Sequence, residues 1–219
     1  MKAETKLNLE YSWAQGVYWA SNGLIFNFAA VFLQHRGYSN YALGIILALG
    51  NIAAFPVQPA VADYIDKRNK KPLLKSSAII MAVSMLLAVA AACIPSACTA
   101  LSAVYVLILA SSILLQPLTN SMSAYLCSWG YDVSFSRARA VGSLCFALCM
   151  AVMGALTRRL SPQTVPIAYA LLVAALLLPL LLMLRQDKTL RRIPPKVFDN
   201  PEKAAGSIGD FIRGNKRFC

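Results

Sequence analysis

Long apolar stretches, separated by short polar loops, run along most of the chain. Each stretch is close to the roughly 20 residues that a helix needs to cross about 30 Å of hydrocarbon. The pattern predicts an all-α polytopic membrane protein with six transmembrane helices, which we expect over residues 12–34, 41–62, 76–95, 99–125, 140–157 and 163–184. We therefore expect a six-helix bundle over residues 1–184 and a basic, proline-broken cytoplasmic linker over residues 185–219.

The composition agrees with a lipid environment, because 58% of the residues are hydrophobic and only 14% are charged. A net charge of +12 would suggest nucleic-acid binding in a water-soluble protein, but the placement of the cations argues against that partner. If the N-terminus is cytoplasmic, every Lys and Arg except Arg36, Arg158 and Arg159 falls on the cytoplasmic side. By the positive-inside rule we expect both termini to be cytoplasmic.

The residues that could perform chemistry do not favour an enzyme. All nine Asp and Glu residues lie in loops, span ends or tails, and the single histidine, His35, lies in a loop. The six cysteines show no CxxC or Cys/His spacing. Because the spans offer no group for acid–base work, we expect no catalytic residue, no metal site and no cofactor.

One charged motif follows directly after the second span, in the stretch ADYIDKRNKKPLL, residues 62–74. Asp66 lies there at the membrane face, close to Lys67, Lys70 and Lys71. One interpretation is an electrostatic contact that links the ends of neighbouring helices. The other is a positive loop that only fixes the topology, and composition does not separate the two.

A second motif opens the fifth span, in the stretch SFSRARAVGSLCF, residues 134–146. Arg139 enters the span, and Ser143 and Phe146 follow at i+4 and i+7 on the same face of the helix. A charged group aligned with a hydroxyl and an aromatic ring is typical of a face that meets a ligand. The alternative is an arginine that reaches back to the inner lipid headgroups.

At these two motifs the sequence resembles the major facilitator superfamily, and within it the branch of oligosaccharide and nucleoside proton symporters that includes lactose permease. The family's loop between spans 2 and 3 reads G-x-x-x-D-R/K-x-G-x-R/K-R/K, and here Ala62 and Asn69 replace its glycines. Asp66 and Lys67 match this loop, and Lys70 and Lys71 supply its basic end. FSRARAVGS, residues 135–143, resembles the branch's more specific signature F/Y-G-R-x-R-x-x-G, and IRGNKRF, residues 212–218, resembles the segment before span 7.

The resemblance implies a substrate-binding wall and a conformational-switch loop. Arg139 aligns with the arginine that binds substrate in lactose permease, and Asn120 falls near a span 4 position where relatives have Asp or Glu. An amide can hydrogen-bond a sugar hydroxyl but cannot take a proton near neutral pH. The implied substrate-binding residues are Arg139, Ser143, Phe146, Asn120, Asn22 and Phe26. The implied switch loop consists of Asp66, Lys67, Lys70 and Lys71.

The function implied by the resemblance is that of the N-terminal half of a secondary transporter. Such a protein takes a small polar organic solute, here a sugar or a nucleoside, across the bacterial inner membrane by proton symport and alternating access. One half supplies one wall of the cavity, so we expect either a fragment that lacks its C-terminal half or two copies that pair as a homodimer. The alternative functions are a non-transporting six-span scaffold or assembly protein, and a membrane enzyme, against which the missing acid–base groups argue.

Overall fold

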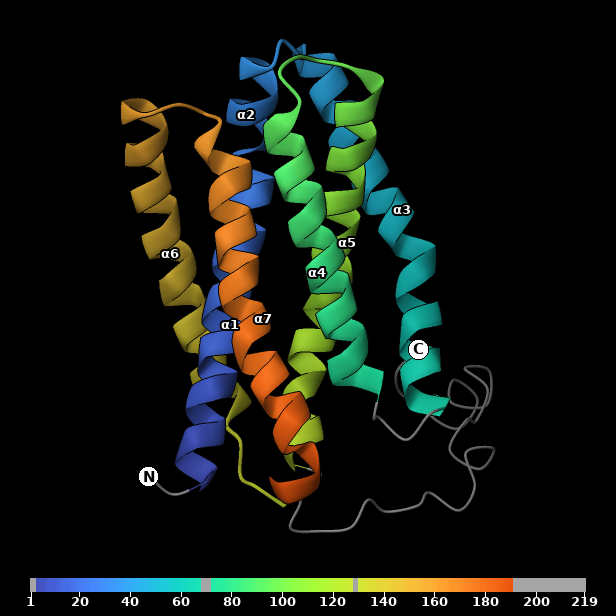
Figure 1. Ribbon diagram of the computed structural model, residues 1–219, viewed down its shortest axis with the longest axis vertical. Helices are drawn as coiled ribbons and strands as arrows, with labels where there is room; N and C mark the ends of the chain where they lie inside the picture. The colour runs from blue at the N-terminus through green and yellow to red at the C-terminus, as the bar shows by residue number, and fades with distance from the viewer. Residues whose placement is uncertain (1–2, 68–71, 128–129, 191–219) are drawn as a thin grey trace, which may run out of the picture.

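The computed structural model describes residues 3–67, 72–127 and 130–190, and all regular structure in these ranges is helical (Figure 1). The helices are α1 (Ala3–Asn27), α2 (Ala29–His35), α3 (Asn40–Lys67), α4 (Pro72–Cys93), α5 (Thr99–Cys127), α6 (Phe135–Arg159) and α7 (Thr164–Leu190). The lower end of the bundle in Figure 1 holds the start of α1 and the ends of α3, α5 and α7. The expected linker over 185–219 begins within α7, and residues 191–219 lie outside the described residues.

The described helices confirm the predicted all-α membrane fold. The five helices α3 to α7 are long and apolar enough to cross a bilayer, and α1 and α2, bent by 45° relative to each other, make a sixth if the pair counts as one span. The bend follows Asn27, whose side-chain Nδ2 donates to the Gly23 carbonyl (2.9 Å) that normally belongs to the helix ladder. The stretch expected as one straight helix over 12–34 is therefore two helices that meet at Phe28.

The helices pack in two rows. One row runs α6, α1, α5, α3 in that order, and α4 and α7 form a second row against α1 and α5. Figure 1 shows α4 and α7 in front of α1 and α5, with α6 and α3 at the two sides. No described helix covers the other side of the first row. We call this side the open face; its partly or fully exposed residues include Trp19, Asn22, Gln116, Asn120, Arg139 and Ser143.

Glycines allow α1 and α6 to approach closely. The Phe146 ring of α6 lies against Gly23 of α1, where any Cβ would overlap it. In the opposite direction Trp19 of α1 lies over Gly142 of α6, and a Cβ at Gly142 would come 2.8 Å from Trp19 Cδ1. Small residues that let large neighbours pack on the backbone are the usual device by which helices associate in lipid.

Side chains from neighbouring helices replace two backbone hydrogen bonds that proline removes. Pro117 in α5 has no N–H for the carbonyl of Ile113, and that carbonyl accepts from Gln58 Nε2 of α3 at 3.4 Å. Pro179 in α7 likewise leaves the Ala175 carbonyl, which accepts from Trp13 Nε1 of α1 at 3.1 Å. An unpaired carbonyl is costly in lipid, so these two contacts tie α3 to α5 and α1 to α7.

Arg36 joins the two loops at the upper end of the bundle. Its guanidinium is buried and donates to the carbonyls of Ala92 and Pro95, both at 3.0 Å, at the C-terminal end of α4. Those carbonyls have no partner inside the helix, and a cation also meets the negative end of the helix dipole there. One of the three arginines predicted outside the membrane thus has a packing role.

Candidate functional site

A fully buried amide, Gln15, organises the polar contacts between α1 and α5. Its Nε2 donates to the Tyr11 hydroxyl (2.8 Å), to Asn120 Oδ1 (3.2 Å) and to the Thr119 carbonyl (3.4 Å). Its Oε1 accepts from Trp19 Nε1 at 3.0 Å. The donors and the acceptor of this amide are therefore all in use, as a buried polar group requires.

Trp19 connects this amide to α6. The guanidinium carbon of Arg139 lies 3.6 Å from the centroid of a Trp19 ring, in the geometry of a cation–π contact. Gly142 provides the space that the indole occupies. Arg139 therefore lies against the bundle at the level of Trp19, which does not favour the alternative that it reaches back to the headgroups.

One turn further along α1, Asn22 continues the same set of contacts. Asn22 Nδ2 donates to Ser112 Oγ (3.1 Å) and to the Tyr18 hydroxyl (3.4 Å), and that hydroxyl donates to the Ser112 carbonyl (3.1 Å). These contacts join α1 to α5 next to Gln15. We use the name polar cluster for Gln15, Trp19, Asn22, Ser112, Asn120 and Arg139.

The polar cluster contains three of the six predicted substrate-binding residues. Arg139 and Asn120 are linked through Trp19 and Gln15, and Asn22 lies one turn along α1 from Trp19. Their location at the open face is consistent with the predicted role, which stays a prediction.

The other three predicted residues lie outside the polar cluster. Ser143 is exposed and its hydroxyl donates to the Arg139 carbonyl (3.3 Å). Phe146 packs on Gly23, and Phe26 is a half-buried residue against the hydrophobic core. Two ring atoms of Phe146 thus contact α1, and the role of its ring in stacking on a solute stays a prediction.

Sequence reasoning missed Gln15 and Trp19. A signal was present, because Gln15, Trp19, Asn22 and Phe26 follow one another at i+4, i+7 and i+11, which places them on one face of α1. Asn22 and Phe26 alone were selected from this stripe.

The predicted switch loop lies mostly outside the described residues. Helix α3 continues through Asp66 and Lys67, but their side chains are outside the described part of the structure, as are Lys70 and Lys71. The proposed contacts of these four residues stay predictions.

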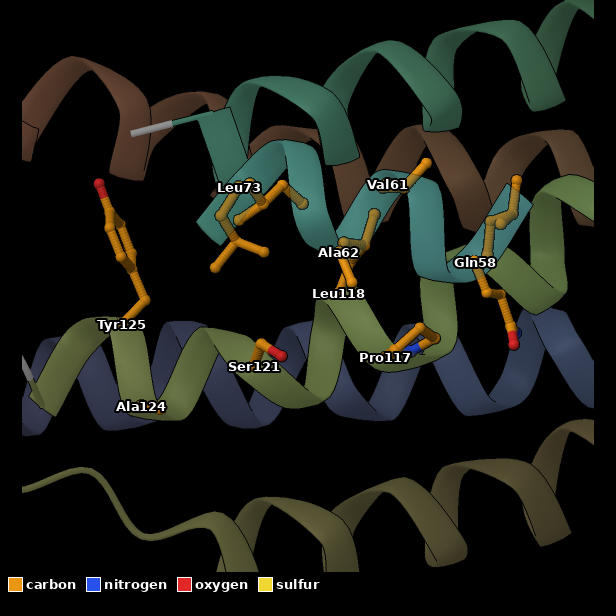
Figure 2. A pocket seen from close by; sticks show the side chains of 11 residues that line it. Gln58, Val61, Ala62, Leu73, Pro117, Leu118, Ser121, Ala124 and Tyr125 are labelled. Carbon is orange, nitrogen blue, oxygen red and sulfur yellow. The ribbon is translucent and has the colours of Figure 1, made fainter. Parts of the chain in front are cut away.

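A pocket of about 180 Å³ lies between α3 and α5, near the start of α4 (Figure 2). Its wall is largely apolar, with Gln58, Ser121 and Tyr125 as polar members beside Pro117. None of the six predicted substrate-binding residues lines it. Because typical small-molecule sites enclose at least about 300 Å³ and several convergent polar groups, we take the polar cluster rather than this pocket as the candidate site.

Comparison with known proteins gives one match. Residues 11–205 match the MFS_1 like family, a stretch that includes all six spans and every residue of the polar cluster. Neither the search of curated proteins nor the search of solved structures returns a match.

Proposed function

The chain belongs to the MFS_1 like family, within the major facilitator superfamily, and from this we propose that it forms a six-helix wall of a secondary transporter for a small polar organic solute. The family match supports a transporter in general rather than an enzyme.

The observation that best supports the proposal is the polar cluster at the open face. Its partly exposed members include a cation, an indole and two amides: Arg139, Trp19, Asn22 and Asn120. Such groups in the membrane-spanning part of a bundle are costly against lipid. Their placement on the side that no described helix covers is the arrangement expected if a second six-helix unit closes a wet cavity over them. That unit is a C-terminal half or a second copy of this chain.

We extend the proposal to proton symport of a sugar or nucleoside, on the resemblance of FSRARAVGS to the branch that includes lactose permease. Asn120 cannot hold the proton, because an amide does not titrate near neutral pH. A proton-binding carboxylate would then belong to the second wall. The distribution of Lys and Arg supports an orientation with both termini in the cytoplasm. The bacterial inner membrane is proposed on the resemblance alone.

Uptake tests this proposal directly. Cells that express the gene from its own locus, compared with cells that lack it, should accumulate at least one radiolabelled member of a panel of sugars, nucleosides and sugar acids. A protonophore should abolish the accumulation if the coupling ion is the proton. Identical uptake by both strains across the panel, with the protein present in the membrane, would favour the scaffold alternative.

The same assay tests the switch loop. We expect Asp66→Asn to lower the rate of uptake severalfold with little change in solute affinity, because the loop would act on the inward–outward equilibrium rather than on the site. Asp63→Asn, one turn earlier in α3, is the matched control. Full uptake by the Asp66 variant would leave the loop as a topology signal only.

A further inference from the structure

The hydrogen bonds inside the polar cluster fix which atoms of Asn120 face outward. Trp19 Nε1 can only donate, so Gln15 must present Oε1 to it. Gln15 Nε2 then points to α5, and because this group donates, Asn120 must accept the hydrogen bond with Oδ1. The orientation of both amides follows from the single indole N–H, and Asn120 Nδ2 is left without an acceptor among the described residues.

The guanidinium of Arg139 also has N–H donors without an acceptor among the described residues. Stacking on Trp19 uses the flat face of the group and leaves the N–H donors at its edge. Within the described ranges, Arg139 has neither an ion pair nor a side-chain hydrogen bond. The carboxylates described there, Glu4, Glu10, Asp63 and Asp132, belong to the lower ends of helices or to a loop, and none pairs with it.

The groups that Arg139 and Asn120 turn outward are therefore donors, and one of them carries a positive charge. The acceptor of Asn120, Oδ1, is engaged by Gln15, and the Ser143 hydroxyl donates to the Arg139 carbonyl of its own helix. Asn22 Oδ1, one turn along α1 from Trp19, is left over as an acceptor, since the Nδ2 of that amide is engaged by Ser112 and Tyr18. The exposed amide of Gln116 lies one turn before Asn120 in α5 and can accept as well as donate. A neutral sugar, whose hydroxyls both donate and accept, would displace water from the guanidinium without compensating its charge.

Resting on the proposed function, we infer that the solute carries an anionic group, a carboxylate or a phosphate, that binds to Arg139 and Asn120. The guanidinium edge gives a bidentate contact to two oxygens of the anion, and Asn120 Nδ2 donates to an oxygen of the same group. Asn22 Oδ1 is placed to accept from a hydroxyl of the solute. The substrate class is then a small hydroxylated anion such as a sugar acid or a sugar phosphate.

Binding to the reconstituted chain tests this inference without requiring transport. Trp13→Phe and Trp129→Phe leave Trp19, on which Arg139 stacks, as the only tryptophan, and its fluorescence reports on the site. Three probes share one ring and differ in charge: glucose, glucuronate and glucose 6-phosphate, titrated in lipid nanodiscs at constant ionic strength. We expect a saturable response to glucuronate, to glucose 6-phosphate or to both, and none to glucose in the same range.

Two variants assign the response to the donors. Arg139→Gln should weaken anion binding by roughly 10- to 150-fold. Asn120→Asp keeps the oxygen that accepts from Gln15 but replaces the outward donor with a negative charge, so it should weaken binding at least as much. The matched control is Arg137→Gln, which removes an exposed charge from the first turns of the same helix and should change nothing.

Several results would overturn the inference: glucose bound as tightly as the anions, no saturable response to either anion, or equal losses in the Arg139 and Arg137 variants with circular dichroism spectra unchanged. The two proposals fail separately. A protein that takes up only neutral solutes contradicts the anion inference alone, whereas one that binds the anions but moves no solute contradicts the transporter alone.

Discussion

The position of Trp19 depends on a glycine of another helix. Trp19 lies over the backbone of α6 at Gly142, with its N–H on Gln15 and its face under Arg139. The indole thus holds the Gln15 amide through its N–H and the Arg139 guanidinium through its ring face. A single methyl group at residue 142 acts on both, because its carbon would come 2.8 Å from Trp19 Cδ1 and 3.4 Å from the Gln15 carbonyl.

We expect Gly142→Ala to destabilise the protein by about 1–3 kcal/mol, since overpacking a close contact forces side chains off their preferred conformations. Thermal unfolding in detergent measures the loss, and a shift in Trp19 emission reports the displaced ring. Gly154→Ala on the same helix is the control, because a Cβ there meets nothing within 4 Å. Equal melting temperatures for the two variants would show that the Trp19 contact tolerates the methyl group.

At this scale the sequence predicted part of the candidate site. Arg139 and Asn120 stand out because they interrupt apolar stretches, and their chemistry is visible without a structure. Gln15 and Trp19 lie near the start of the first expected span, where polar and amphipathic residues are common at the membrane boundary. Their role depends on which atoms of α5 and α6 lie beside them, and that is set by packing.

The helices extend further than the apolar stretches that predicted them. Helix α3 continues to Lys67, α6 begins at Phe135 and α7 runs to Leu190. Hydropathy marks the part of a helix that lies in hydrocarbon, whereas the backbone hydrogen bonds continue into the headgroup region. Ser134 provides a start signal for α6, since its hydroxyl accepts from the N–H of Arg137 (3.4 Å). The break at Phe28 had no comparable signal: Asn27 donates to the i−4 carbonyl just before it, but Asn51 makes the same contact inside the continuous helix α3.

The contacts of Arg36 with the loop at the upper end of the bundle are expected to contribute to the stability of the protein. Arg36→Gln removes a guanidinium that donates to Ala92 and Pro95, and we expect a loss of about 1.5–3 kcal/mol from these charge-assisted bonds. Chemical unfolding in detergent gives the difference in stability. Arg158→Gln, an exposed arginine at the upper end of α6, should have no measurable effect. Equal losses would mean that Arg36 acts through its net charge rather than through these carbonyls.

For the whole molecule, the all-helical class followed from hydropathy alone, because lipid allows few other structures, and the six predicted spans agree with the structure if α1 and α2 count as one. Hydropathy did not predict the order of the helices within the two rows. It depends on pairs such as Gly142 with Trp19 and Gln58 with the carbonyl that Pro117 leaves, which join residues far apart in the chain.

Topology is the property of the whole molecule that the charges predict. In a cysteine-free background, Ser161→Cys should react with a membrane-impermeant maleimide added to intact cells, and Lys70→Cys should react only after the cells are opened. The reason is that the cationic loops stay on the cytoplasmic side. Labelling of the residue 70 variant in intact cells would reverse the orientation that we propose for the bundle.

The pairing of Gln15 with Asn120 has a consequence for biosynthesis. The two residues are 105 positions apart, so the ribosome completes Asn120 roughly 5–20 s after Gln15 at about 5–20 residues per second. During that interval the glutamine has only Tyr11 and Trp19 of its own helix as partners. The nascent first span is therefore expected to stay beside the insertion machinery, where water and protein can solvate the amide, until the fourth span arrives to receive it.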